Sequence, residues 1–331
     1  MNTPNTRAIA VVVAYNRREL LAEVLDALDA QTVRPHVIVV DNASSDGSGD
    51  LARDRAGVEL IELARNTGGA GGFAAGLAIA LDRHEPEWVW LMDDDTVPTP
   101  TALEELLRAA DAGDVAAAGS RVVWTDGSEH PMNTPRENPF ASREERLRAA
   151  RLGGIAVRST SFVSMLVRAE AAREAGLPIA DYFIWNDDFE YSTRVIRGRF
   201  GLHVPASVVV HKTKALASTD ADPGGRFYYE VRNKLWMFRR SASLGPLEKL
   251  VYGASSIRRW IRTFARSADR AVLRDGLRRG WHDGTRFRPR PNADALAGLG
   301  EASDAVARVE AAAARQAAAG RSAAANPGAA T

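Results

Sequence analysis

This chain has no cysteine, and it has no apolar run of the length that crosses a membrane. The absence of cysteine excludes a disulfide framework, a thiolate nucleophile and a sulfur-ligated zinc site, so any metal must be held by oxygen and imidazole ligands. A bilayer-spanning helix needs about 20 apolar residues, and the amino terminus also lacks the apolar stretch of a signal peptide. We therefore expect a cytoplasmic protein.

Lysine is also scarce: only four of the 43 basic residues are lysines, and none precedes Lys212. The net charge of +1, the hydrophobic fraction of 45% and the charged fraction of 26% are those of a soluble globular protein. This balanced charge and the absence of a nucleic-acid-binding motif argue against nucleic acid as a partner. The 331 residues are enough for one large domain or two ordinary ones.

Strands and helices are predicted to alternate along the first part of the sequence. Apolar runs at residues 9–14, 37–40, 58–63 and 88–92 predict buried strands, and the apolar residues within 20–28 recur at helical spacing. This alternation predicts an α/β fold with a mostly parallel sheet flanked by helices. In such sheets ligands bind at the carboxyl ends of the strands, which is where the polar clusters of this sequence lie.

Three carboxylates, Asp93, Asp94 and Asp95, directly follow the predicted strand at 88–92. Because side chains alternate along an extended chain, Asp93 and Asp95 should point to one side and Asp94 to the other. Adjacent carboxylates repel each other, so we expect a cation among them, and a pair of this spacing suits a divalent ion that bridges to phosphate oxygens. The alternative is a solvated turn whose acids cap the next helix.

A second polar group lies later in the chain, in Asp187, Asp188, Glu190 and the isolated His211. The three acids are also compatible with the first turn of a helix that runs through Arg194, where negative charge is favoured in any case. A single histidine is more often a structural hydrogen-bonding group than a metal ligand. The residues alone leave these alternatives open.

Six motifs, taken together and in this order, resemble the family 2 inverting glycosyltransferases of GT-A fold. The resemblance covers roughly residues 8–240, and its finer features, at 182–191 and 227–234, are similar to galactofuranosyl- and rhamnosyltransferases. The implied fold is a GT-A (Rossmann-like), mostly parallel sheet flanked by helices. The motifs are Val13–Arg17, Asp41–Gly47, Asn66–Gly69, Asp93–Asp95, Asp187–Glu190 and His211.

The resemblance implies a role for each acidic motif. Asp93, Asp95 and His211 would hold a divalent metal, Mn²⁺ or Mg²⁺, which stabilises the negative charge of the departing nucleoside diphosphate. Asp188 matches the general base that takes the proton from the acceptor hydroxyl. Asp187 beside it would hold the loop or touch the acceptor.

The same resemblance places the donor and the acceptor on different loops. Backbone groups and a positive charge after the first strand would meet the uracil and the phosphate, and the glycine-rich run after the third strand allows close approach of a ligand. The expected donor-binding residues are Tyr15, Asn16, Arg17, Asp41, Arg65, Asn66, Gly69 and Asp94. The expected acceptor-binding residues are Trp185, Glu190, Tyr229, Arg232 and Asn233.

The carboxyl-terminal part carries most of the positive charge. Between Pro246 and Arg290 there are twelve basic residues against four acidic ones, and an apolar stripe at helical spacing includes Ile257 and Ile261 together with Trp260 and Phe264. A basic amphipathic helix of this kind predicts binding to an anionic membrane surface, whereas packing of the stripe on the catalytic domain is the alternative.

We therefore divide the chain into three parts, whose bounds follow changes in composition. A catalytic domain spans 1–245, a basic amphipathic helical extension spans 246–291, and an alanine-rich tail spans 292–331. The tail has too few large apolar residues to bury much surface, so we expect it to be disordered.

The function implied by the resemblance is inverting, metal-dependent transfer of galactofuranose from UDP-galactofuranose. The expected acceptor is a polyprenyl-diphosphate-linked rhamnosyl-GlcNAc of cell-wall galactan synthesis, which would place the enzyme peripherally on the inner face of the cell membrane. A rhamnosyltransferase that uses dTDP-rhamnose shares these motifs and stays an alternative. The sequence does not predict an oligomeric state.

Two other classes of protein share parts of this sequence pattern. Leu91–Val97 looks like the nucleophile motif of haloacid-dehalogenase-like phosphohydrolases, but those enzymes need a lysine between their two acidic motifs, and this chain has none there. A protein that only binds a nucleotide sugar would not need both acidic clusters and a histidine. Both readings are therefore disfavoured.

Overall fold

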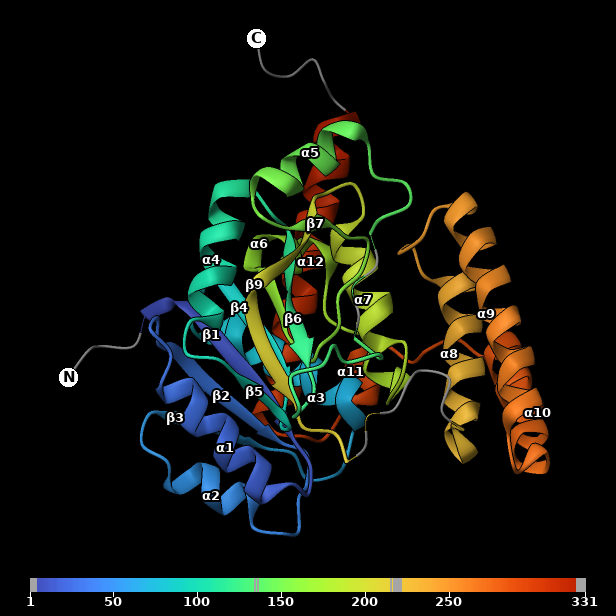
Figure 1. Cartoon of the computed structure of the whole chain (residues 1–331), viewed down its shortest axis with the longest axis horizontal. Helices are drawn as coiled ribbons and strands as arrows, with labels where there is room; N and C mark the ends of the chain where they lie inside the picture. Colours follow the sequence, from blue (N-terminus) through green and yellow to red (C-terminus); the bar gives the residue numbers. More distant parts are fainter. Residues whose placement is uncertain (1–4, 134, 136, 215, 217–221, 326–331) are drawn as a thin grey trace.

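The computed structural model describes residues 5–133, 135, 137–214, 216 and 222–325. At its centre is a nine-stranded sheet with the strand order β3-β2-β1-β4-β8-β6-β9-β5, and β7 pairs with β9 (Figure 1). The strands are β1 (Asn5–Ala14), β2 (Pro35–Asp41), β3 (Val58–Glu62), β4 (Trp88–Asp93), β5 (Thr96–Pro98), β6 (Ala117–Val123), β7 (Ile155–Ala156), β8 (Met165–Arg168) and β9 (Gly201–His211).

Helices connect the strands and cover both faces of the sheet (Figure 1). They are α1 (Arg18–Asp29), α2 (Ser48–Asp54), α3 (Gly68–Arg83), α4 (Ala102–Gly113), α5 (Arg143–Arg151), α6 (Ala169–Ala175), α7 (Asp187–Ile196), α8 (Phe227–Arg240), α9 (Pro246–Arg266), α10 (Arg270–Arg286), α11 (Asn292–Ala295) and α12 (Glu301–Ala325), with short 3-10 turns η1 (Ala180–Tyr182) and η2 (Gly224–Arg226).

The sheet is parallel in its first half and mixed in its second. Strands β3, β2, β1 and β4 run parallel, whereas β8 is antiparallel to both β4 and β6. Strand β9 is parallel to β6 and antiparallel to the short β5. The predicted α/β class with a mostly parallel sheet is confirmed, and the carboxyl ends of β1, β2 and β4 lie at one edge.

Alternation along β1 explains the two layers of core. Ile9 and Val11 face α3 and α12, while Ala10 and Val12 face α1 and α4, and all four are fully buried. Because successive strand residues point to opposite faces, a continuous apolar run is needed where helices cover both sides. This is the pattern that the apolar runs of the sequence show.

Helix α3 approaches the sheet closely because glycines line its inner face. A Cβ atom at Gly72 would lie 2.5 Å from Val13 Cγ1, and one at Gly76 would lie 2.4 Å from Val11 Cγ1. Only glycine permits this approach. The amino end of α3 is also tied to the loop after β2, since Asn42 Nδ2 donates to the Gly68 carbonyl at 2.9 Å. The glycine-rich segment is thereby held at the carboxyl edge of the sheet.

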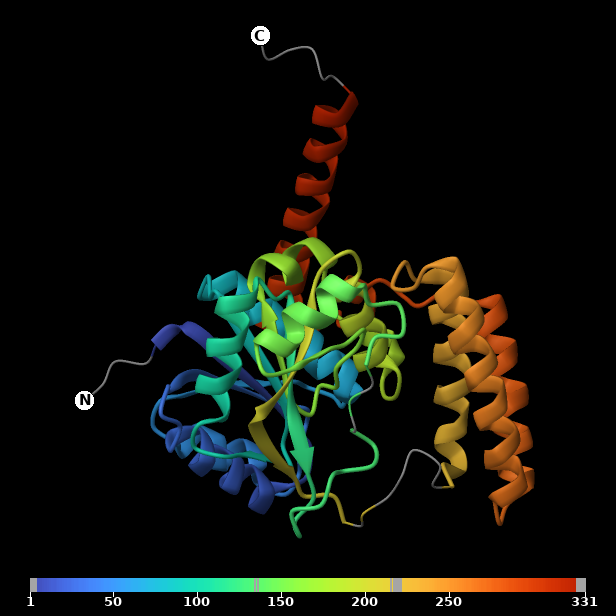
Figure 2. The same ribbon diagram turned by 45° about the horizontal axis from the view of Figure 1, so that its top comes forward.

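Helices α8, α9 and α10 form a helical unit beside the sheet domain (Figure 1, Figure 2). Its small core joins Phe227 and Val231 of α8 to Leu273 of α10, with Trp260 and Phe264 of α9 packed against them. The helical character predicted for 246–291 is thus present, but α8, which the prediction placed in the catalytic domain, packs with this unit. Among the described residues, no helix combines the length and apolar character needed to cross a bilayer.

The prediction of a disordered tail from residue 292 is wrong for residues 292–325. Helix α12 returns to the sheet domain, where Ala302, Ala305 and Val306 are fully buried beside α3 and α6. Arg308 also pairs with Asp82 at 2.7 Å. Small side chains suffice here because they let the helix lie close to its neighbours. The far end of α12 extends away from the domain (Figure 2), and residues 326–331 lie outside the described part.

Candidate functional site

The acidic triplet and His211 meet at the carboxyl edge of the sheet. Strand pairing brings them together, because Thr96 of β5 lies opposite His211 of β9. One ligand atom from each of Asp93, Asp95 and His211 lies within 4.8 Å of the others. Asp94 points elsewhere and accepts a hydrogen bond from the Tyr15 backbone N–H at 2.8 Å. Asp94 and Asp95 form a turn rather than an extended segment, and Arg17 contacts both, so the predicted strand-like alternation is corrected. What the structure does show is that Asp94 lies outside the group formed by Asp93, Asp95 and His211.

Burial and mutual repulsion control the charge of the triplet. Burial, followed by the charges of Asp95 and Asp94, raises the pKa of Asp93 well above its usual value. Burial also raises the pKa of Asp94 to about 6. For Asp95 burial acts in the same direction, but contacts with His211 and Arg17 outweigh it and lower the pKa of Asp95.

Arg17 supplies the cation expected among the acids. Its guanidinium lies 3.2 Å from Asp94 Oδ1 and also contacts Asp95. One buried oxygen is nevertheless left over, since Asp95 Oδ1 has no hydrogen-bond partner and lies 3.3 Å from His211 Nε2. An orphaned carboxylate oxygen beside an imidazole nitrogen and a second carboxylate is a donor set that fits a divalent cation.

The loop before α7 is strained and firmly held. Phe183, Trp185 and Asn186 have φ values of 65°, 68° and 64°, a region that non-glycine residues rarely adopt. Such strain persists only where surrounding contacts over-determine the conformation. Here Asn233, which is fully buried, donates from Nδ2 to the carbonyls of Tyr182, Ile184 and Trp185. These contacts fix where α7 begins.

Asp187 and Asp188 are the first two residues of α7 and are half-buried. Burial, followed by repulsion from Asp188, raises the pKa of Asp187 to about 8. Burial raises the pKa of Asp188 as well, although a hydrogen bond from Ser161 and the charge of Lys234 oppose the shift. The acidic helix start considered in the sequence is real, and it coexists with strongly perturbed carboxyls of the kind found at functional sites.

The two acidic groups lie at the same edge of the molecule. The charge of Asp187 contributes to the raised pKa of Asp93. Asp187 also adjoins the start of α3, because a Cβ atom at Gly69 would lie 4.0 Å from Asp187 Oδ2. Asp187 therefore lies near both Asp93 and the start of α3.

A hydrogen-bonded chain joins the two groups through residues that the sequence did not single out. His211 Nδ1 lies 3.1 Å from Asn133 Oδ1, and Asn133 Nδ2 donates to Ser161 Oγ at 3.3 Å. The Ser161 hydroxyl in turn bonds Asp188. This bond to Asn133 orients the imidazole so that Nε2 faces Asp95. Asn133 and Ser161 lie in irregular segments, where no periodicity marks them.

Lys234 is a further residue that sequence reasoning missed. It lies on α8, is 5% exposed and stands 4.6 Å from the centre of the Phe189 ring. Burial lowers the pKa of Lys234 to about 8. The sequence did hold a signal for this residue: lysine is scarce, with only four in the chain, and Lys234 falls inside the 227–234 motif.

Four of the predicted donor-binding residues surround the ends of β1 and β2. Tyr15 is 45% exposed, and Asn16 Oδ1 accepts from the Ser45 N–H at 2.8 Å. Asp41 is buried and accepts from the Ser44 N–H at 3.3 Å. Of this group, Tyr15 and Arg17 contact the acidic triplet, whereas Asn16 and Asp41 bond the loop that follows β2.

Two predicted ligand contacts are corrected by the structure. Arg65 donates to the carbonyls of Ala295 and Ala297, so it anchors the segment around α11. Glu190 is 1% exposed, and its carboxylate is taken up by Arg194 at 2.9 Å and by the Ser241 hydroxyl. In a helix Glu190 lies on a different face from Asp188, which turns it into the core.

The predicted acceptor residues Arg232 and Asn233 of α8 make hydrogen bonds within the fold. Arg232 donates to the carbonyls of Asp181 and Tyr182, and the side-chain amide of Asn233 donates to carbonyls of the loop before α7. Asn233 is therefore withdrawn as an acceptor ligand. Arg232 still borders a cavity of about 190 Å³, which Asn66 and Tyr229 also line. Trp185, which belongs to the strained loop before α7, is half-buried.

A larger hollow of about 720 Å³ lies away from both acidic groups. It is lined by Arg148 of α5, Glu174 of α6 and Arg199, among others, and by neither the triplet nor the start of α7. Its basic and acidic side chains are interspersed. Size alone therefore does not locate the candidate site in this protein.

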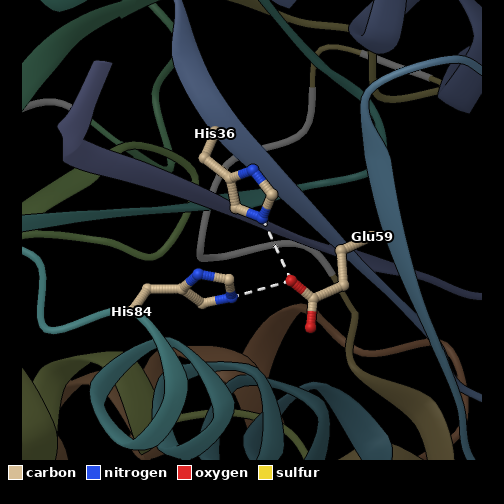
Figure 3. A group of neighbouring side chains, drawn as sticks. All are labelled: His36, Glu59 and His84. Carbon is tan, nitrogen blue, oxygen red and sulfur yellow. Dashed lines mark hydrogen bonds and ion pairs between the residues drawn. The ribbon is translucent and has the colours of Figure 1, made fainter. Parts of the chain in front are cut away.

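A second cluster of possible metal ligands lies at the opposite edge of the sheet (Figure 3). Glu59 Oε2 lies 3.0 Å from His36 Nε2 and 2.7 Å from His84 Nε2, and Arg83 pairs with the other oxygen at 2.9 Å. These contacts, chiefly that with His36, lower the pKa of Glu59 to about 2. These partners satisfy the Glu59 carboxylate. His36 is therefore a suitable control position for tests of His211.

Comparison with known proteins identifies the class to which this fold and site belong. Residues 9–176 match the model of Glycosyl transferase family 2, and the chain therefore belongs to that family. It is similar to Galactofuranosyltransferase GlfT1 of Mycolicibacterium smegmatis, with 33% identity over 208 residues, which is 60% of this chain and 68% of that relative.

Solved structures support the fold at low sequence identity. S. aureus TarS 1-349 in complex with UDP superposes with a TM-score of 0.59 at 14% identity, over 93% of this chain and 88% of that chain. The mannosyltransferase PcManGT from Pyrobaculum calidifontis, in complex with GDP-Man and Mn²⁺, superposes with a TM-score of 0.51 at 19% identity, over 95% and 88%. The predicted GT-A class is thus confirmed.

Proposed function

We propose that this glycosyltransferase transfers galactofuranose from UDP-galactofuranose with inversion, in the synthesis of cell-wall galactan. One observation carries the proposal: Asp93, Asp95 and His211 meet at the same sheet edge as Asp187 and Asp188, within a chain similar to a galactofuranosyltransferase. The similarity extends over 208 residues of this chain. It supports the sugar class more strongly than motif order alone.

A divalent ion, Mn²⁺ or Mg²⁺, fits the oxygen and nitrogen atoms of Asp93, Asp95 and His211. Asp95 Oδ1, which is buried without a hydrogen bond and lies 3.3 Å from His211 Nε2, is the observation that favours this assignment. When bound, such an ion stabilises negative charge on a departing diphosphate. Arg17, which now neutralises Asp94 and Asp95, would then be released toward the phosphates, where its guanidinium can make charge-assisted hydrogen bonds.

Asp188 is proposed as the general base that removes the proton from the attacking acceptor hydroxyl. Ser161 holds its carboxylate, and Lys234 favours the ionised form that a base requires. Asp187 is kept as a positioning residue, because a carboxyl with a pKa of about 8 is protonated at neutral pH and can donate a hydrogen bond. The two carboxyls therefore differ in role because their surroundings differ.

For the donor nucleotide we keep Tyr15, Asn16, Asp41, Asn66 and Gly69, all of which lie on loops at the carboxyl edge of the sheet. Asp94 is kept too, since its backbone partner belongs to the Tyr15 loop. These loops border the acidic triplet, so a nucleotide placed there would direct its phosphates toward Asp93 and Asp95. Arg65 is removed from this set for the reason given above.

For the acceptor we keep Tyr229 and Arg232, which line the 190 Å³ cavity, and Trp185 of the loop before α7. Tyr229 stacks on Phe183, with ring centres 5.4 Å apart, and so presents a fixed aromatic surface. A polyprenyl-diphosphate-linked rhamnosyl-GlcNAc is the acceptor we propose, with the enzyme at the cytoplasmic face of the membrane. A dTDP-rhamnose-dependent rhamnosyltransferase is the alternative, while family membership removes the phosphohydrolase reading.

Thermal unfolding with nucleotides tests the donor and the metal together. A ligand that binds only the folded state at 100 times its Kd adds about 2.7 kcal/mol of stability, which raises the melting temperature by roughly 5 °C. We expect UDP with Mn²⁺ to give such a rise and dTDP with Mn²⁺ to give a much smaller one. A larger rise with dTDP would favour the rhamnosyltransferase.

Two histidine variants provide the matched control. His211→Ala should lose the part of the UDP shift that depends on Mn²⁺, whereas His36→Ala, in the cluster at the opposite edge, should keep it. If both variants respond to Mn²⁺ like the wild type, His211 is not a metal ligand. If neither UDP nor dTDP stabilises the protein, with or without metal, the proposed donor class is wrong.

A further inference from the structure

Helix α9 has its apolar side turned outward. Leu247, Leu250, Val251, Ile257 and Ile261 are exposed by 60%, 70%, 44%, 57% and 65%. Their spacing of three and four residues places them on one face, which we call the outer face of α9. The fully buried positions of the same helix are instead small and polar, namely Ser256 and Thr263. A helix on an ordinary domain surface shows the reverse arrangement.

The exposed apolar side chains of the molecule are concentrated in this region. Of the fourteen large apolar residues exposed in the described part, eight lie between 247 and 287, on α9, on α10 and just after it. Scattered single apolar residues need no explanation, but the five that share one face of α9 mark an interaction surface. The outer face alone extends about 21 Å along the helix, at 1.5 Å for each residue from 247 to 261.

The packing alternative accounts for only part of the sequence pattern. Trp260 turns inward, donates to Glu230 Oε1 at 3.0 Å and meets Phe227 edge-on, and Phe264 packs beside it. Ile257 and Ile261, which share the predicted stripe, stay on the outer face. The stripe is therefore divided between a core that is already complete and a surface that no described residue covers.

Charge indicates what covers the outer face. The segment from Pro246 to Arg290 carries twelve basic residues and four acidic ones, and Arg258 and Arg262 are exposed within the outer face itself. Two copies of so basic a surface would repel each other, whereas anionic lipid headgroups would be attracted, with each basic residue near the surface contributing about 1 kcal/mol. Apolar side chains flanked by arginine suit the boundary between headgroups and acyl chains.

We propose that the outer face of α9 docks on the surface of an anionic lipid bilayer. The helix lies on the membrane rather than across it, with its five large apolar side chains among the acyl chains and its arginines among the headgroups. Docking requires no donor or acceptor. Its consequence for catalysis does rest on the proposed function: α8, which packs against α10, also carries Tyr229 and Arg232 at the 190 Å³ cavity, so docking brings that cavity near a lipid-linked acceptor.

Flotation of the full-length protein with vesicles tests this proposal. The wild type should float with phosphatidylglycerol-containing vesicles at least tenfold more than with phosphatidylcholine vesicles. Combining Leu250→Ser, Ile257→Ser and Ile261→Ser should reduce binding at least tenfold. The matched control is Leu147→Ser with Ile155→Ser, two apolar residues on α5 and β7 that are exposed by 48% and 39% and are not part of the outer face of α9, and it should bind like the wild type.

The outcomes separate docking from failure of the fold or of the proposed donor. All variants should keep the wild-type melting temperature and UDP-dependent shift, because the substituted side chains are exposed. Binding of the triple variant equal to wild type would overturn the proposal, as would absence of wild-type binding to anionic vesicles. A wild-type dimer in sedimentation that the triple variant abolishes, without vesicle binding, would show instead that the face joins two copies of the chain.

Discussion

Among single residues, the two adjacent carboxyls at the start of α7 differ in their partners. Burial raises the pKa of both Asp187 and Asp188, but for Asp188 a hydroxyl partner and a lysine charge oppose the shift. The pKa of Asp187 is raised to about 8. The roles that we propose for the two acids follow from this difference in their surroundings.

Asp188→Asn is expected to remove the base without removing the donor site. The rate of transfer should fall by about 10²- to 10⁴-fold, because an amide does not accept the hydroxyl proton. The UDP-dependent thermal shift should stay as in the wild type. Asp50→Asn, whose side chain is 78% exposed on α2, is the control and should keep full activity. An Asp188→Asn protein that turns over normally would show that another group is the base.

The charge of Lys234 adds a pH test to the same prediction. A base works when ionised, so activity should be lost as the pH falls through the raised pKa of Asp188. Removing the positive charge with Lys234→Met raises that pKa further, and the acid limb of the pH–rate profile should move to higher pH. Lys249→Met, whose Nζ bonds the Ser241 carbonyl at 3.1 Å, should leave the limb in place.

At the next scale, glycine decides how closely elements pack. Gly276, Gly280 and Gly284 form a stripe of period four on α10, and each faces the backbone or Cβ atoms of α8. A side chain on this stripe would push the two helices apart. The helical unit thus depends on three residues that contribute almost no apolar surface themselves.

Gly280→Ala should destabilise the helical unit. Its Cβ would lie 2.7 Å from the Tyr228 carbonyl oxygen and 2.9 Å from Val231 Cβ, so α8 or α10 must shift, at a cost of about 1–3 kcal/mol. Gly253→Ala on α9 meets no atom within 4 Å and should instead be neutral or stabilising by up to about 1 kcal/mol. Urea unfolding of both variants measures the difference. Equal stability would show that α8 and α10 do not pack as described.

Considered as a whole, the molecule closes on itself through its carboxyl-terminal helix. Glu301 pairs with Arg83 at the end of α3, and Ala302 and Val306 complete the core between α3 and α6. The chain therefore leaves the sheet domain after β9, builds the helical unit and returns. The contacts that tie α12 to the domain span more than 200 residues of sequence.

Truncation measures how much the packing of α12 on the sheet domain contributes to the free energy of unfolding. Deleting residues 301–331 removes three fully buried side chains and should cost about 3 kcal/mol or more of unfolding free energy. Deleting only 314–331 leaves those contacts intact and should change stability by less than about 1 kcal/mol, because residues 314–316 and 318 are exposed. If both truncations leave the unfolding free energy unchanged, α12 is not part of the core.

Local pattern was enough to predict the parallel half of the sheet and the position of the aspartate triplet at the end of its fourth strand. Strand and helix periodicity fix which face a residue occupies whatever the rest of the chain does, and the carboxyl ends of parallel strands then lie at one edge. The same periodicity did not indicate that the strand β8 runs antiparallel to its neighbours, and it did not reveal the helix α5.

Partners distant in the sequence settled the remaining questions. Arg65 and Asn233 look like ligand-binding residues until folding brings backbone carbonyls within their reach, and the Glu190 carboxylate accepts a hydrogen bond from Ser241. The alanine-rich segment of α12 is part of the core because it packs against α3. The apolar face of α9 stays exposed because Trp260 and Phe264 already fill the contact between α9 and α8. Each outcome depends on which donor, acceptor or apolar surface arrives from elsewhere, and only the assembled molecule supplies that.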